Sequence, residues 1–258
     1  MKTVRKRMII GTVLIIGIMI CSCGMKKNNS DESKDITLKS KPELVLNERQ
    51  KEILEEVGLP TDAEKLDSSQ QEAIIAIDEM LTAVEKKYNR SFSYSGYVEQ
   101  GPLESEYLMA YPSDGNPRTD SFEVRKTDNG YEDDYMNVAI RDDYAKYVEE
   151  IITSNLHNEH IRVFTEIYTT ELTSVPENKQ DYKGKVSSWK AVFLYLTDND
   201  EIPKYVQSIQ EILKNENLKY DCEVIFLKED VIDKLTEYNY EDYLSSDYYV
   251  QKEAVEVD

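Results

Sequence analysis

Apolar residues in the early part of the chain recur every three or four positions, which is the spacing of a helix that buries one face. This pattern predicts a short helix over 47–57 and a longer helix over 69–88. Each begins with a polar residue that is followed three positions later by Gln or Glu, the spacing of a capping box. The two candidate pairs are Asn47 with Gln50 and Ser69 with Glu72.

Beyond Asn89 the apolar residues alternate with polar ones, as they do along a half-buried strand. The alternation predicts strands that start near Phe92, Tyr107 and Phe122, with turn-rich segments between them. Asn129-Gly130 offers one more turn after the third strand. Short connections between successive strands favour an antiparallel meander.

Helical and strand patterns alternate through the rest of the chain. A helix is predicted from Asp142, and the apolar run 190–196 indicates a strand in the middle of a sheet. Pro203 fits the first turn of a helix that starts near Asp200, because backbone N–H groups in that turn have no acceptor within the helix, so proline loses no hydrogen bond there. The other predicted elements are a strand at 161–167, a strand around Cys222, a short helix at 231–235 and a closing strand at 249–257.

These elements predict an α+β fold with mostly antiparallel sheets and helices packed on one face. They also favour two similar α+β halves, an N-terminal half over 43–157 and a C-terminal half over 158–258. Three helix-to-strand junctions look alike, because each leaves a helix through polar residues that include an asparagine. An α-β-β repeat would explain this likeness. The ease with which asparagine adopts the left-handed conformation at helix ends explains it more simply.

The N-terminus has the charge and apolar pattern of an export signal. Lys2, Arg5, Lys6 and Arg7 form a basic start, and residues 8–20 form an uncharged apolar run. A membrane-spanning helix needs ~20 such residues, whereas the core of a secretory signal needs only ~7 to 15. The pattern therefore predicts that the rest of the chain is exported.

Ile20-Cys21-Ser22-Cys23 resembles the lipobox of bacterial lipoproteins, with Ile20 in the aliphatic position, Ser22 in the small position and Cys23 in the modified position. The resemblance implies cleavage between Ser22 and Cys23. It also implies a diacylglyceryl thioether on Cys23, with palmitate-type acyl chains, and anchoring at the extracytoplasmic face of the cell membrane. Cys21 fits the modified position badly, because bulky Ile20 would then stand where a small residue is needed. An uncleaved membrane anchor and an ordinary cleaved signal remain as alternatives for residues 1–22.

Residues 23–42 are polar and show no sustained apolar period, which predicts a flexible tether with a typical reach of ~25 Å. Removing residues 1–22 takes away four basic residues and no acidic one, so the formal net charge moves from −20 to −24. Such a charge disfavours binding to nucleic acid and to anionic lipid headgroups. It favours a basic protein, a peptide or a cationic envelope component as partner, although solubility alone is the simpler explanation of the charge.

Cys222 is the one thiol that remains if Cys23 is acylated and Cys21 is removed with the signal, so no internal disulfide is expected. It shares a period of two with Val224 and Phe226, which predicts a small core residue on a strand rather than a nucleophile.

No pattern in the chain predicts a specific chemistry. His157 and His160 have neither the spacing nor the third ligand of a zinc site. The acidic segments 128–134 and 198–201 do not fit a calcium loop, and they are interpreted as a turn and a helix N-cap. We therefore assign no catalytic residue, no metal ligand and no cofactor other than the lipid on Cys23.

The chain has 19 tyrosines against 5 phenylalanines, and several tyrosines lie among acidic residues near the C-terminus. Tyrosine suits wet interfaces, because its ring is apolar and its hydroxyl finds a partner. A coding bias would produce the same excess without a function. The candidate interaction surface consists of Tyr238, Tyr240, Tyr243, Tyr248 and Tyr249.

The sequence thus favours a non-enzymatic binding or interaction module at the cell envelope, held to the membrane by its lipid. An envelope hydrolase is one alternative, since 51 acidic residues supply many carboxylate pairs. A toxin-immunity lipoprotein is another.

Overall fold

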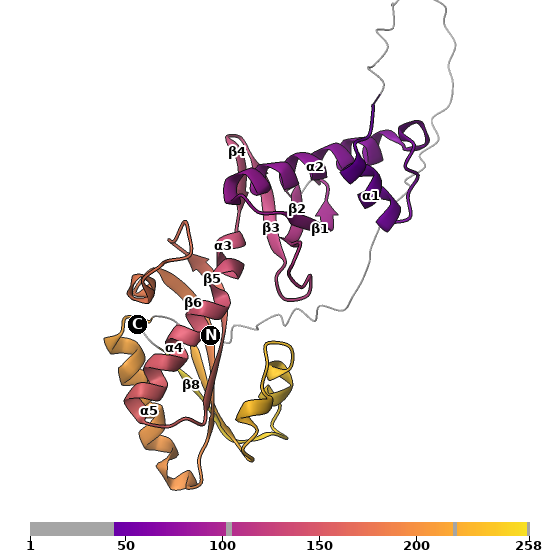
Figure 1. The fold of residues 1–258 in the computed structure, drawn as a ribbon. Helices are drawn as coiled ribbons and strands as arrows, with labels where there is room; N and C mark the ends of the chain where they lie inside the picture. Colours follow the sequence, from indigo (N-terminus) through magenta and orange to yellow (C-terminus); the bar gives the residue numbers. More distant parts are fainter. Residues whose placement is uncertain (1–43, 102–104, 219–220, 257–258) are drawn as a thin grey trace, which may run out of the picture. The chain divides into compact units, whose positions relative to one another are not determined.

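A computed structural model of the chain describes residues 44–101, 105–218 and 221–256 (Figure 1). The predicted cleavage and lipidation residues Ser22 and Cys23, and the predicted tether 23–42, lie outside the described residues. The described chain holds two four-stranded sheets and five α-helices, and the predicted α+β fold is confirmed. In the part of the chain that the structure describes, no helix is both long and apolar enough to cross a membrane.

Two helices precede the first sheet. Helix α1 (Glu48–Glu56) begins with the predicted capping box, in which the Asn47 side chain accepts from the Gln50 N–H. Helix α2 (Ser68–Tyr88) forms where it was predicted, but its capping pair is Asp67 with Gln70 rather than Ser69 with Glu72. A short 3-10 turn, η1 (Ala63–Lys65), lies between the two helices.

Sheet A is the predicted antiparallel meander, extended by one strand. Its strands follow the chain in the order β1 (Phe92–Val98), β2 (Tyr107–Pro112), β3 (Phe122–Thr127) and β4 (Gly130–Asp133). The segment 128–134 makes the turn between the last two strands and the β4 strand itself, and Gly130 adopts a positive φ of 128° there. Helix α2 covers one face of this sheet, and the first core lies between them.

Helix α3 (Tyr135–Ala139) follows sheet A and was not predicted. Helix α4 (Arg141–Leu156) comes next, and its buried residues belong to the second core together with sheet B. The change from one core to the other lies at α3, and α4, which the sequence analysis assigns to the N-terminal half over 43–157, packs in the second core. An amphipathic pattern shows which face of a helix is buried but not which sheet buries it.

Sheet B has the order β5-β6-β7-β8, with β6 (Val186–Tyr195) in the interior as predicted for 190–196. Helix α5 (Ile202–Asn215) connects β6 to β7 (Cys222–Leu227), and these two strands are parallel, while the other neighbours are antiparallel. The edges are β5 (Ile161–Thr170) and β8 (Tyr249–Val255). The 3-10 turns η2 (Lys179–Tyr182) and η3 (Asn199–Glu201) lie in the connections.

The two faces of sheet B are covered differently. Helices α4 and α5 pack on one face and enclose the second core, which includes Cys222 with 1% of its surface exposed. The opposite face carries Trp189, Phe193 and their neighbours, and the segment 228–248 folds over it through the 3-10 turns η4 (Ile232–Lys234) and η5 (Tyr240–Leu244). Helices thus cover one face of the sheet, and an irregular segment covers the other.

The three similar helix-to-strand junctions all leave their helices through the left-handed region. Asn89 has a φ of 50° after α2, and Asn217 has a φ of 53° after α5. The corresponding residue after α4 is His157, with a φ of 52°, rather than one of the asparagines beside it. The shared pattern therefore has a local backbone cause, because few L-residues adopt this conformation at low cost.

Candidate functional site

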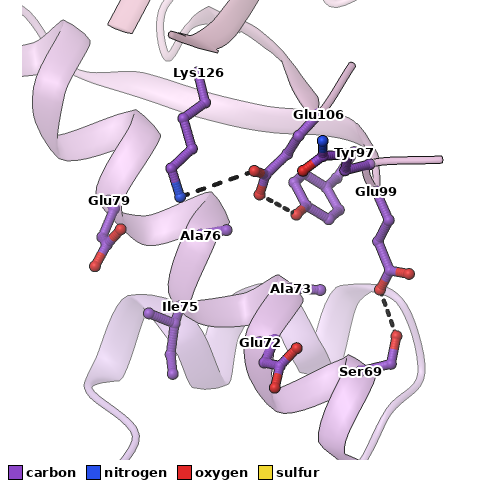
Figure 2. A pocket seen from close by; sticks show the side chains of 11 residues that line it. Ser69, Glu72, Ala73, Ile75, Ala76, Glu79, Tyr97, Glu99, Glu106 and Lys126 are labelled. Atoms are coloured by element: carbon purple, nitrogen blue, oxygen red, sulfur yellow. Dashed lines mark hydrogen bonds and ion pairs between the residues drawn. The ribbon is translucent and has the colours of Figure 1, made fainter. Parts of the chain in front are cut away.

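An open groove of about 390 Å³ lies between α2 and the strand ends of sheet A (Figure 2). One wall is the exposed side of the first half of α2, including Glu72, Ala73, Ala76 and Glu79. Residues at the end of β1, before β2 and on β3 make the other wall: Tyr97, Glu99, Gln100, Glu106 and Lys126. The small alanine side chains leave space between helix and sheet.

A short chain of polar contacts orders the sheet side of the groove. The Tyr97 hydroxyl donates to Glu106 Oε1 at 2.6 Å, and Lys126 Nζ lies 3.9 Å from Glu106 Oε2. Figure 2 shows the Glu106 carboxylate between these two side chains. Ser69 at the start of α2 donates to Glu99 and ties the strand end to the helix.

The groove is strongly acidic. Four glutamates line it against a single lysine. Burial and the hydrogen bond to the Glu106 carboxylate raise the pKa of Tyr97. The pKa of Tyr131, whose hydroxyl donates to Glu79, is raised as well, by burial and by that carboxylate. Both tyrosines therefore remain neutral donors at physiological pH, and the carboxylates set the charge of the groove.

This arrangement has the chemistry to bind a cation. Its carboxylates accept hydrogen bonds and attract ammonium or guanidinium groups. Within the described residues, no group of three or more His, Cys, Asp or Glu side chains has the geometry to hold a metal ion. The Ser69 hydroxyl donates to a carboxylate and has no histidine beside it in the groove.

The five tyrosines of the predicted interaction surface lie in different environments. Tyr240 is 9% exposed and stacks on Phe164, with ring centroids 4.5 Å apart and planes at 6°. Tyr249 is half-buried on β8. Tyr243 contacts Tyr248 at a ring distance of 4.9 Å, and Tyr248 and Tyr238 are exposed. The structure thus gives Tyr240 a packing role, and it leaves Tyr238 and Tyr248 as the open members of the set.

The histidines do not form a shared site. His157 terminates α4 in the left-handed conformation. His160 begins the approach to β5, and its Nδ1 lies 2.9 Å from Asp230 Oδ2, with both side chains largely exposed. The second acidic segment, 198–201, caps η3, because the Asp198 side chain accepts from the Asp200 N–H.

The groove residues were not predicted as a site from the sequence. They come from α2, from both sides of the β1–β2 connection and from β3, and no spacing along the chain links them. The only hint in the sequence is that glutamates lie on the side of α2 opposite to its apolar face. Any solvent-exposed helix face carries such residues, so this pattern does not indicate a site.

Comparison of the sequence with family models and with curated proteins finds no match. A solved structure of a DUF5037 family protein from Ruminococcus gnavus aligns with 70% of this chain and with 92% of its own chain. The two are 16% identical, with a TM-score of 0.36. A likeness at that level transfers neither fold detail nor function to this chain.

Proposed function

We propose that this chain is a lipid-anchored lipoprotein that binds a cationic partner, a basic peptide or protein of the cell envelope, without transforming it. The observation that carries the binding role is the groove beside α2, where four glutamates face one lysine. The sequence supports the location, through the basic and apolar start and the Ile20-to-Cys23 motif.

The chemistry of the groove fits an extended basic segment better than a small neutral molecule. Its walls carry carboxylates along their length, and the alanines of α2 leave room for a side chain stem. Lysine and arginine side chains bury their apolar stems while their charged heads contact carboxylates. The net charge of −24 on the mature chain would also speed the encounter with such a partner.

The groove is tested by removing charge from its helix wall. In the variant Glu72→Gln/Glu79→Gln, the affinity of the full mature chain for a penta-lysine peptide is expected to fall about five- to tenfold at low salt. This is the effect of losing two partly exposed ion pairs. Calorimetric titration of the chain in detergent measures the affinity.

The matched control is Glu55→Gln/Glu56→Gln, which removes the same charge from α1, where both glutamates are exposed and outside the groove. We expect its affinity to change less than twofold. Equal losses in the two variants would mean that the peptide senses only net charge, and the groove would not be the site.

The anchor is tested separately. Cys23→Ala is expected to abolish incorporation of labelled palmitate and to leave the precursor with its signal intact, because the thioether forms at that sulfur. Cys21→Ala, two residues earlier in the same motif, is expected to be processed normally. Mass spectrometry of the N-terminus of each variant shows whether the signal has been cleaved and the lipid attached. An unmodified N-terminus in the wild-type protein would refute the anchor.

A further inference from the structure

The cores of the two sheets are joined through a narrow region. Residues 44–134 (module A) and residues 140–256 (module B) each enclose a core of their own. Helix α3 lies between them and contributes side chains to both cores, since Tyr135 belongs to the first core and Met136 to the second. Among the described residues, Tyr88 and Ala139 are the partly buried apolar side chains that pack against both cores.

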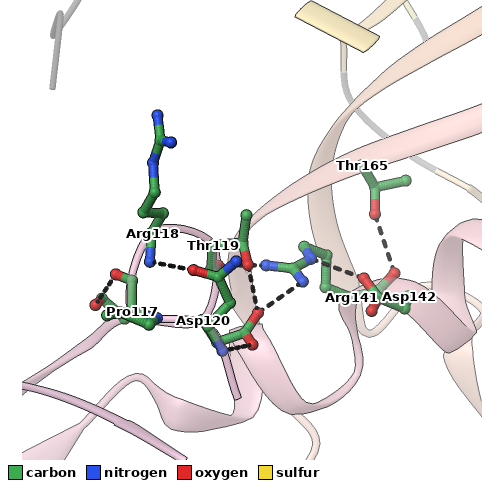
Figure 3. A network of polar contacts seen from close by, with 9 residues as sticks. Pro117, Arg118, Thr119, Asp120, Arg141, Asp142 and Thr165 are labelled. Atoms are coloured by element: carbon green, nitrogen blue, oxygen red, sulfur yellow. Dashed lines mark hydrogen bonds and ion pairs between the residues drawn. The ribbon is translucent and has the colours of Figure 1, made fainter. Parts of the chain in front are cut away.

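A polar cluster around Arg141 connects the modules at a second place (Figure 3). Arg141 is the first residue of α4, and its guanidinium points to the β2–β3 loop of module A. There it donates to the Thr119 carbonyl and, through Nη2, to Asp120 Oδ1 at 3.0 Å. Nε donates to Asp142 Oδ1 at 2.8 Å, within module B.

Both sides of this contact are held in place by their own modules. The Asn116 N–H donates to Asp120 Oδ2 at 2.7 Å, and the Thr119 hydroxyl donates to Asp120 Oδ1 at 3.0 Å. On the other side, Thr165 of β5 donates to the Arg141 carbonyl at 3.2 Å. The side chains of Arg141 and Asp120 are only 19% and 21% exposed. An ion pair this sheltered is screened by water much less than one on an open surface.

The protonation state of Asp120 favours the contact. Burial by itself would raise the pKa of this carboxyl, but the Asn116 N–H and the Arg141 guanidinium outweigh that effect and hold the pKa below its ordinary value. The carboxylate is therefore charged at any physiological pH, and the contact persists.

We propose that module A and module B can swing relative to each other about α3, and that the hydrogen bonds of Arg141 to Thr119 and Asp120 are the clasp that holds them together. The reason is the contrast between two extensive cores and a joint that includes one five-residue helix, two shared apolar side chains and the hydrogen bond that Asn137 of this helix donates to the Tyr168 carbonyl of β5. Loss of the clasp frees the orientation of the modules and leaves each core intact.

The test measures the distance between the modules in the full mature chain. Spin labels are placed at two exposed helix positions through Glu52→Cys on α1 and Lys214→Cys on α5. Pulsed electron spin resonance then gives the distribution of the distance between the labels. Arg141→Gln and Asp120→Asn are each expected to add a second population of distances. The ratio of separated to clasped molecules should rise at least about tenfold, the factor for losing one hydrogen bond to a charged group.

The matched control is Arg162→Gln. Arg162 is also a half-buried arginine paired with carboxylates, but its partners Glu149 and Asp233 lie in module B. Its distance distribution is expected to match that of the unsubstituted chain. The proposal is overturned if both clasp variants keep the original distance distribution. It is also overturned if the distance distribution of the unsubstituted chain is already as broad as the distributions of the variants. It is also overturned if both variants unfold, because neither core should need the clasp in order to form.

Discussion

Replacing Lys190 by methionine is expected to stabilise the protein at neutral pH. Lys190 lies in the interior strand β6, its side chain is fully buried, and its Nζ reaches the Ser188 carbonyl at 3.5 Å. Burial lowers the pKa of this amine from 10.5 to about 8, although the charge of Asp221 acts in the opposite direction. The ammonium is thus less stable inside the fold than in the unfolded chain, and methionine fills a similar volume without a charge.

The sign of the pH dependence follows from that shift. Below pH 8 the amine is charged in both the folded and the unfolded protein, and burying this charge lowers the free energy of unfolding by its full amount. As the pH rises from 8 to 10.5, the folded protein holds a neutral amine while the unfolded chain still binds the proton, so this cost disappears. Two and a half pKa units correspond to about 3 kcal/mol. The advantage of Lys190→Met should therefore be largest near pH 7, at up to about 3 kcal/mol, and should vanish near pH 10.5.

Urea unfolding of the full chain at a series of pH values checks this expectation. The quantity of interest is the difference in unfolding free energy between variant and wild type, since other groups titrate equally in both. Lys214→Met, on the exposed side of α5, serves as the control. A difference for Lys190→Met that stays constant between pH 7 and 10.5 would show that this amine does not titrate as its burial implies.

Tyr240→Ala is expected to cost about 3 to 5 kcal/mol of stability, the usual effect of removing a large buried aromatic ring. The ring stacks on Phe164 and meets Phe193 edge-on, with centroids 6.4 Å apart, so that it seals the outer face of sheet B. Its loss would expose that face to water. Tyr240→Phe keeps the ring and should change the unfolding free energy by less than about 1 kcal/mol.

Comparing Tyr240 with Tyr238 shows how much of the stability effect comes from the burial of the ring. Tyr238 is 65% exposed and two residues away, and Tyr238→Ala is expected to stay within about 0.5 kcal/mol of the wild type. Chemical denaturation of the three variants side by side measures these effects. If Tyr240→Ala were as stable as Tyr238→Ala, the segment 228–248 would not be part of the fold in solution.

Local patterns in the sequence were sufficient to predict most elements, because caps and apolar periods act over a few residues. The Asn47 cap, the alternation around Cys222 and the Pro203 helix start are examples. The second cap was misplaced because Asp67 with Gln70 and Ser69 with Glu72 have the same spacing, and only the tertiary fold selects one of them.

Features that depend on contacts distant in sequence were not predicted. Nothing in the pattern of α4 shows that sheet B, and not sheet A, covers its apolar face. The sequence predicts a short helix at 231–235, where the 3-10 turn η4 forms, but it does not show that the segment 228–248 covers Phe193 and its neighbours. The groove also could not be predicted from local patterns, since its carboxylates come together only after α2 packs beside sheet A.

The burial of Cys222 determines how the protein behaves towards oxidants and labelling reagents. Burial raises the pKa of this thiol to about 12, so at neutral pH the group is the unreactive thiol rather than the reactive thiolate. Among the described residues, Cys222 is the free cysteine and it is buried, so the described fold presents no exposed thiol to form mixed disulfides with neighbouring proteins. A maleimide dye added to a variant with a surface cysteine among the described residues is therefore expected to label that position and to leave Cys222 unlabelled.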